Sequence, residues 1–163
     1  MLNTLCMEMM RYYSGDPGRI QHFVKVHAFA KLIGELEHIG AETMEILEAA
    51  AYVHDIGIKP AEEKFGSGAG PLQEQEGPAV AEEMLQRLGF EKQLIERVCY
   101  LVGHHHTYTQ IDGMDYQILV EADFLVNLHE GNADKAGVES AYKTIFRTES
   151  GKRICREMFV TQF

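Results

Sequence analysis

The feature that most constrains the fold of this chain is its apolar periodicity. Apolar residues recur every three to four positions, which is typical of amphipathic α-helices, and strand patterns are nearly absent. The pattern predicts helices over about 19–38, 42–55, 78–88, 91–105 and 116–129, with one or two more between about 134 and 159. Short connections join most of these segments. We therefore expect an all-α fold, a compact single-domain helical bundle of about six to seven helices.

The chain of 163 residues suits one compact domain, 1–163, that buries a substantial core. The predicted helices divide into a core of about 19–128 and a C-terminal helical extension of about 133–163. Residues 61–76 are the one glycine-rich, polar stretch, and they predict a loop beside whatever site exists. Apolar residues in the tail "ICREMFVTQF" would allow a homodimer.

The net charge of −10 argues against binding to a nucleic-acid polymer and against adhesion to an anionic membrane. A small anionic substrate is still compatible, because a bound cation inverts the local field. No apolar run is long enough to span a membrane, and the N-terminus does not resemble a signal peptide. The three cysteines have no CxxC spacing and are expected to be free thiols. We expect a cytoplasmic protein.

His22 occupies a position where the helical pattern calls for an apolar residue. At 100° per residue, Val26 and Ile33 fall within about 40° of it. A lone histidine on an apolar face is more often a core residue, hydrogen-bonded to a backbone carbonyl, than a metal ligand. His27 and His38 fall on the opposite side of the same helix, so we expect them at the surface.

Asp123 repeats this anomaly in the helix 116–129. Leu119 and Val120 lie within about 60° of it, so its carboxylate is expected to face the core. Acidic residues are almost never buried without a partner. A buried salt bridge is a weak explanation, because Lys and Arg are sparse on the apolar faces. Glu121 is about 160° away from Asp123 and is expected to be exposed.

The segment "AAAYVHDIGIKP", residues 49–60, ends an apolar helix with His54 and Asp55. Burying an ionised carboxylate costs several kcal/mol unless something compensates it. With His22 and Asp123, these residues supply two imidazoles and two carboxylates, a ligand set for a divalent ion. One ion would satisfy all four groups, whereas four separate structural explanations are needed without it.

The pattern resembles the HD superfamily of metal-dependent phosphohydrolases. The superfamily signature is a first His on an amphipathic helix, a His-Asp pair and a distant Asp. The matching segments are "HFVKVHAFAKLIGELE" with His22, "AAAYVHDIGIKP" with His54 and Asp55, and "VEADFLVNL" with Asp123. The resemblance covers about residues 19–128. It implies an HD-domain type fold in which these four residues hold one divalent transition metal ion, Mn, Fe, Co, Ni or Zn.

Many members of the superfamily carry histidines before the final Asp, where they bind a second metal or contact substrate phosphate. In "LVGHHHTYT", His104 and His105 look like that pair, and His106 is left over. The helix dipole alone also favours histidines at a helix C-terminus. Gln73 stands where members with two metals usually carry another His, so the resemblance implies one ion and leaves a second as an alternative. Glu74 and Glu76 are alternative ligands, or solvated residues of an acidic loop.

The resemblance implies a phosphohydrolase, of phosphomonoesterase or phosphodiesterase type, that acts on a nucleotide or other small phosphorylated metabolite. Asp55 would orient a metal-activated water. Lys59, His104 or His105 would hold phosphate oxygens or protonate the leaving group. Arg19 and Lys25 are further candidates, or solvated helix charges. The alternatives are a non-catalytic metal-stabilised ligand-binding or sensor domain and a di-iron HD-type oxygenase, which needs further ligands.

Overall fold

The computed structural model describes residues 1–163, which form nine α-helices, one short 3-10 helix and no strand. The helices are α1 (Leu2–Tyr12), α2 (Pro17–Leu36), α3 (Ala41–Val53), α4 (Ile58–Phe65), α5 (Gly70–Arg87), α6 (Lys92–Val102), α7 (Met114–Glu130), α8 (Lys135–Thr144), α9 (Glu149–Met158) and η1 (Val160–Gln162). The all-α prediction is confirmed, although the helices outnumber the six to seven expected.

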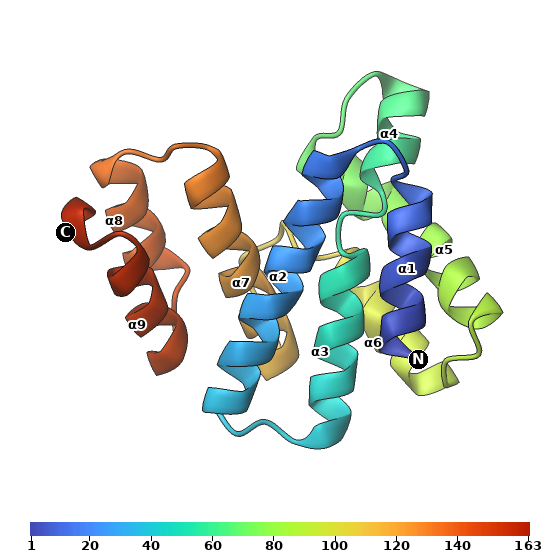
Figure 1. Ribbon diagram of the computed structural model, residues 1–163, viewed down its shortest axis with the longest axis horizontal. Coiled ribbons are helices and arrows are strands. Elements are labelled where there is room, and N and C mark those ends of the chain that lie inside the picture. The colour runs from blue at the N-terminus through green and yellow to red at the C-terminus, as the bar shows by residue number, and fades with distance from the viewer.

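Three helices build the centre of the fold. α2 packs between α3 on one side and α7 on the other (Figure 1). Their facing residues are apolar and fully buried, as Val26, Leu47 and Leu119 show for the three helices in turn. This arrangement brings the second turn of α2, the end of α3 and the middle of α7 to one point.

The remaining helices cover the two sides of this centre. α1, α5 and α6 lie on the side of α3, and α8 and α9 lie beyond α7 (Figure 1). Of the buried apolar residues, 34 form one cluster that includes members of α1, α6 and α9. None of the helices combines the length and the apolar character needed to cross a lipid bilayer.

The prediction of a loop over 61–76 was wrong for most of its length. α4 ends at Phe65 and α5 begins at Gly70, so only residues 66–69 lack helical structure. A Cβ atom on Gly57 would collide with the backbone of α5 at Gln73 and Gly77. Gly57 thus permits α4 and α5 to approach closely, whereas within 61–76 Gly66 ends α4 in the left-handed conformation and Gly70 begins α5.

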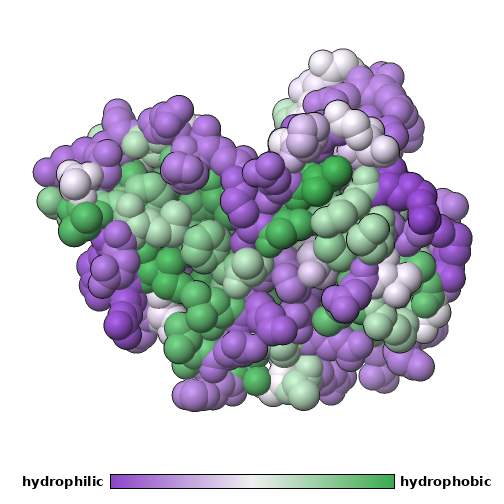
Figure 2. All heavy atoms as spheres, in the orientation of Figure 1, coloured by the Kyte–Doolittle hydropathy of each residue, from purple (hydrophilic) through white to green (hydrophobic).

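An apolar surface covers the region where the C-terminal helices approach the outer face of α2 (Figure 2). Leu32 and Leu36 on α2 are 43% and 52% exposed, and Val160 in the tail is 69% exposed. The expected homodimer is compatible with this surface and stays a prediction.

Candidate metal centre

The four predicted ligands converge where α2, α3 and α7 meet. His22 lies in α2, His54 and Asp55 directly follow α3, and Asp123 lies in α7; all four are buried. His22 Nε2 lies 3.2 Å from His54 Nε2, 3.1 Å from Asp55 Oδ2 and 3.2 Å from Asp123 Oδ1. His54 Nε2 lies 3.4 Å from the same two carboxylate oxygens. The periodicity argument thus placed two helical residues correctly toward the core.

Both imidazoles present Nε2 to the cluster because Nδ1 is engaged elsewhere. Nδ1 of His54 lies 2.8 Å from the carbonyl oxygen of Ala51. Nδ1 of His22 lies 3.2 and 3.3 Å from the two carboxylate oxygens of Glu130. With Nδ1–H donating to these acceptors, each neutral ring carries its lone pair on Nε2, as in histidines that bind metals.

The residues present fit a divalent cation. Asp123 Oδ1 is buried without a hydrogen-bond partner. Two neutral Nε2 atoms 3.2 Å apart would direct lone pairs at each other and at two carboxylates. A divalent ion would satisfy these nitrogens and oxygens together, and the donor set is one that such ions accept.

Without a cation, protons on the imidazoles must offset the charge of the two carboxylates. Burial alone would lower the pKa of His22, but the carboxylates of Asp123 and Asp55 raise it to about 9. Burial also disfavours the charged form of His54, yet Asp55 and Asp123 raise its pKa well above the ordinary value. Burial would raise the pKa of Asp123, and the two imidazoles instead lower it. The cluster therefore attracts positive charge.

A second group of potential ligands lies on the other side of Asp55. Asp55 Oδ1 is 3.4 Å from His105 Nε2, which is buried without a hydrogen-bond partner. Nδ1 of His105 lies 2.8 Å from the carbonyl oxygen of Val102. Asp55, His105 and His106 offer ligand atoms that lie within 4.8 Å of one another. Asp55 therefore faces both groups, with one oxygen toward each.

The structure brings His105 to the site but places His104 outside it. The ring of His104 stacks on Tyr100 with centroids 4.0 Å apart, and its Nδ1 lies 2.7 Å from the Tyr100 carbonyl oxygen. His106, which the sequence reasoning left over, joins Asp55 and His105 instead. α6 ends before these histidines and turns follow, so helical spacing does not decide which of them face the site.

Gln73 and Glu74 of α5 hold the turn that carries His106. The buried Gln73 donates from Nε2 to the carbonyl oxygen of Gly68 at 2.7 Å, so its Oε1 faces His106 Nε2 at 3.1 Å. Glu74 accepts from the backbone N–H of His106 at 2.9 Å. The alternative ligand Glu76 accepts instead from Lys64 at 2.7 Å.

Two predictions of exposure were wrong. His27 is half-buried, since its Nε2 lies 2.9 Å from Glu48 Oε1 and its ring stacks on Tyr52. Glu121 is fully buried, because α9 covers the face of α7 that periodicity assigns to solvent. His38 is exposed, as expected.

Basic residues lie on the open side of the cluster. Arg19 Nη1 is 3.9 Å from Asp55 Oδ2. A pocket of about 560 Å³ lies over His22 and is lined also by Arg19, Lys25 and Glu130. Lys25 Nζ is 2.9 Å from Glu130 Oε1. These charges make the entrance to the cluster polar.

The end of α1 fixes the backbone around Asp55. The buried hydroxyl of Tyr13 donates to the carbonyl oxygen of Asp55 at 2.7 Å, and the hydroxyl of Tyr12 donates to that of Ile56 at 3.0 Å. Nζ of Lys59 donates to the carbonyl oxygen of Tyr12 at 3.3 Å and lies 5.0 Å from the centroid of the Tyr12 ring. Lys59 therefore sits at the rim and does not reach the ligand cluster.

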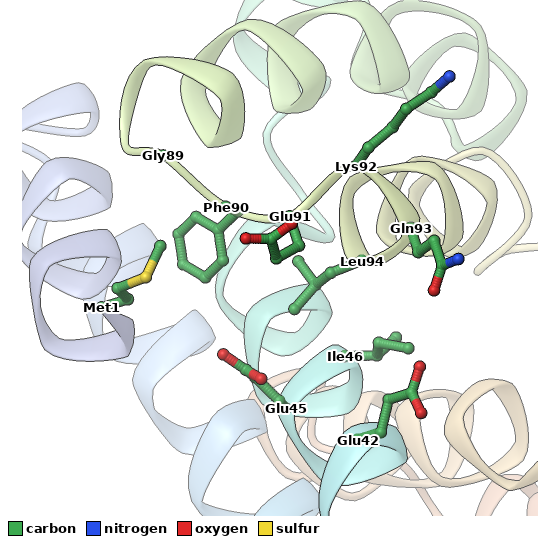
Figure 3. A pocket seen from close by; sticks show the side chains of 10 residues that line it. All are labelled: Met1, Glu42, Glu45, Ile46, Gly89, Phe90, Glu91, Lys92, Gln93 and Leu94. Carbon is green, nitrogen blue, oxygen red and sulfur yellow. The ribbon is translucent and has the colours of Figure 1, made fainter.

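A pocket of about 620 Å³ lies at the other end of α3 (Figure 3). Glu42 and Glu45 of α3 and Glu91 supply its carboxylates, and Phe90 supplies part of its apolar wall (Figure 3). Twelve residues separate Glu42 from His54, or roughly 18 Å along a helix. None of the ligand cluster lines this pocket, so its size does not mark it as the chemical site.

Comparison with known proteins agrees with this geometry. A model of the HD domain family matches residues 19–144. A crystal structure described as a predicted HD superfamily hydrolase, from an uncultured Thermotogales bacterium, is similar with a TM-score of 0.67 and 24% identity. That similarity covers 99% of this chain and 86% of the other. None of the curated protein sequences is significantly similar to the chain. The chain belongs to the HD domain family.

Proposed function

We propose that the protein is a metal-dependent phosphohydrolase that acts on a phosphate ester of a nucleotide or other small phosphorylated metabolite. The observation that carries the proposal is the buried meeting of His22, His54, Asp55 and Asp123, with Asp123 Oδ1 left without a hydrogen-bond partner. Membership of the HD domain family supports it. A divalent cation held there would lower the pKa of water toward ~7 and offset negative charge on a phosphoryl oxygen.

The protein's own residues are placed to orient water and move a proton. In the hydrolysis, the oxygen of water bonds to phosphorus, the ester bond to phosphorus breaks, and the leaving oxygen takes up a proton. Asp55 is placed to orient the water, because its two oxygens face different groups. His105 is placed to accept the proton of the water: Nδ1 donates to Val102, so the neutral ring has its lone pair on Nε2.

Arg19 is the cation best placed to bind the phosphate. Its guanidinium lies 3.9 Å from Asp55 Oδ2, forms no shorter ion pair and belongs to a side chain that is 36% exposed. Its N–H donors are therefore free for phosphate oxygens, which a guanidinium binds in pairs. Lys59 lies in the adjoining pocket and stays a predicted contact to phosphate or leaving group. His104 has no part in this scheme.

We propose one ion at the four-residue site. A second ion would use Asp55, His105 and His106. The side-chain amide oxygen Oε1 of Gln73 faces His106 Nε2, so that nitrogen is already occupied as a donor. A di-iron oxygenase requires the second ion, and elemental analysis of the metal content per chain separates the two functions.

The direct test is phosphate release by protein that has been stripped and reloaded with Mn, Fe, Co, Ni or Zn, against a panel of nucleotides and sugar phosphates. His54→Ala and His27→Ala make a matched pair, because each removes one imidazole and only His54 lies in the cluster. We expect release by wild type and His27→Ala and none by His54→Ala. Failure with every ion, beside a working control enzyme, would contradict the proposal. One bound ion without turnover would favour the metal-stabilised binding domain.

A further inference from the structure

A second, smaller pocket borders the proposed site. It has a volume of about 190 Å³ and is lined by residues from the end of α1, the start of α2 and α4. Arg19 lines both this pocket and the larger one over His22. Because Arg19 also lies 3.9 Å from Asp55 Oδ2, a molecule whose phosphate binds at Arg19 can extend into the smaller pocket.

The polar groups of this pocket are mixed in charge and in hydrogen-bonding capacity. Asp16 and Glu62 supply carboxylates, Ser14 a hydroxyl and Lys59 an ammonium. A second phosphate would be repelled by the two carboxylates, and an organic cation would be repelled by Lys59 and Arg19. An apolar group would remove water from all of them without replacing its hydrogen bonds. A neutral group with several hydroxyls can both donate to the carboxylates and accept from the ammonium.

We propose that this pocket holds the leaving group of the substrate, and that the leaving group is a neutral polyhydroxyl unit such as a glycerol or pentose. This inference rests on the proposed phosphohydrolase function. The ester oxygen departs with the polyol and gains a proton, and the oxygen of water remains on phosphorus. Half of the lining residues, Tyr12, Tyr13, Ser14 and Asp16, precede residue 19, where the family match begins. Half of the pocket therefore lies outside the residues that match the family model.

The test compares ligands that differ only in hydroxyl groups. Turnover is measured with glycerol 3-phosphate and n-propyl phosphate. Binding to the Mn²⁺-loaded protein is measured by calorimetry with 3,4-dihydroxybutylphosphonate and butylphosphonate, which cannot be hydrolysed. We expect wild type to prefer the hydroxylated member of each pair. Glu62→Gln should reduce that preference about tenfold, the effect of a hydrogen bond to a charged group. Ser14→Ala removes a neutral, exposed hydroxyl and should reduce the preference about threefold.

Glu63→Gln is the matched control, since it removes the same charge one position along α4 and does not line the pocket. It should leave the preference unchanged. Equal use of the two members of a ligand pair by wild type would overturn the inference. It would also be overturned if Gln21→Ala, in the larger pocket, lost the preference while Glu62→Gln kept it. Turnover of both esters without preference would retain the phosphohydrolase and remove the polyol pocket. A binding preference without turnover would retain the pocket and remove the phosphohydrolase.

Discussion

Asp123 and Glu121 are two buried carboxylates, two residues apart on α7, with opposite surroundings. Glu121 Oε1 accepts from the Thr148 hydroxyl at 2.7 Å. Its Oε2 accepts from Gln117 at 2.6 Å and from the backbone N–H groups of Arg147 and Thr148 at 3.2 Å. Asp123 Oδ1 has no hydrogen-bond partner and faces two imidazole nitrogens.

The difference shows which buried carboxylate points to a ligand. Burial is common to both and decides nothing. The hydrogen-bonding capacity of the Glu121 carboxylate is satisfied by groups at the start of α9, so Glu121 has a structural role. Asp123 Oδ1 has no hydrogen-bond partner and faces only the two imidazole nitrogens, so its position requires a cation or a proton between them. Burial raises the pKa of Glu121 despite its hydrogen bonds, whereas the imidazoles of His22 and His54 lower the pKa of Asp123.

The largest expected effect tests Asp123 directly. Asp123→Asn keeps the shape of the side chain and removes its charge, so we expect it to abolish metal binding while the helical content stays unchanged. Metal per chain after dialysis and circular dichroism measure the two properties. Glu121→Gln is the control and should keep the ion. Equal metal content in both variants would break the comparison.

The converse effect belongs to Glu121. Glu121→Ala leaves the Thr148 hydroxyl and backbone N–H groups unpaired, so we expect a loss of about 3 kcal/mol in the free energy of unfolding. Urea denaturation of the metal-free protein measures it. The variant should still bind metal once folded. A loss below about 0.5 kcal/mol would show that α9 does not depend on this carboxylate.

A smaller effect is expected at Glu130, which orients His22 through Nδ1 and is paired with Lys25. Glu130→Gln weakens that acceptor, so we expect metal affinity to fall about tenfold, as for other groups that orient a metal ligand. Calorimetric titration with Mn²⁺ gives the affinity. Lys25→Gln frees Glu130 for His22 and should not weaken binding. If Glu130→Gln bound Mn²⁺ as tightly as wild type, His22 would need no carboxylate to orient it.

Tyr13 supports the same centre from outside the region that matches the family. Tyr13→Phe removes the shorter of two hydrogen bonds to the carbonyl oxygen of Asp55, which the backbone N–H of Ile58 still reaches at 3.0 Å, so we expect a loss of about 1 kcal/mol in stability. Urea denaturation with and without Mn²⁺ measures it. Tyr12→Phe is the comparison, since its bond to Ile56 is longer and less buried. A larger loss for Tyr12→Phe would contradict the assigned importance of the Asp55 contact.

The smallest effect is a dependence on pH. Because the pKa of His22 is raised to about 9, its protonated form stabilises the metal-free fold below the ordinary value near 6.5, and this contribution is lost as pH rises through 9. A metal ion must displace the same protons, so its stabilising effect should grow over that range. Thermal unfolding at pH 7 and pH 9.5, with and without Mn²⁺, measures both trends. A metal-free melting temperature that rises with pH would contradict the assignment.

The sequence predicted the residues whose placement depends on helical periodicity. His22 and Asp123 were recognised because each interrupts an apolar stripe, and the structure buries both. Glu121 was wrongly predicted to be exposed, because the periodicity of one helix does not show that α9 covers a second face of α7. The predicted loop over 61–76 failed because its glycines stand at helix ends: Gly66 ends α4 in the left-handed conformation and Gly70 begins α5.

The residues that were missed depend on turns and on contacts distant in sequence. His106 joins the site through a turn after α6, held by Gln73 and Glu74 from another helix. Glu130 and Tyr13 act through Nδ1 of His22 and the carbonyl oxygen of Asp55. Of these residues, only Glu130 could have been suggested beforehand, because it lies two turns after Asp123 on the same face of α7.

The most direct test of the central claim is anomalous diffraction from crystals of the protein grown with Mn²⁺. The account predicts an anomalous peak in contact with Nε2 of His22, Nε2 of His54, Asp55 and Oδ1 of Asp123. A map without a peak there, in which Oδ1 of Asp123 is hydrogen-bonded to protein or water alone, would contradict it.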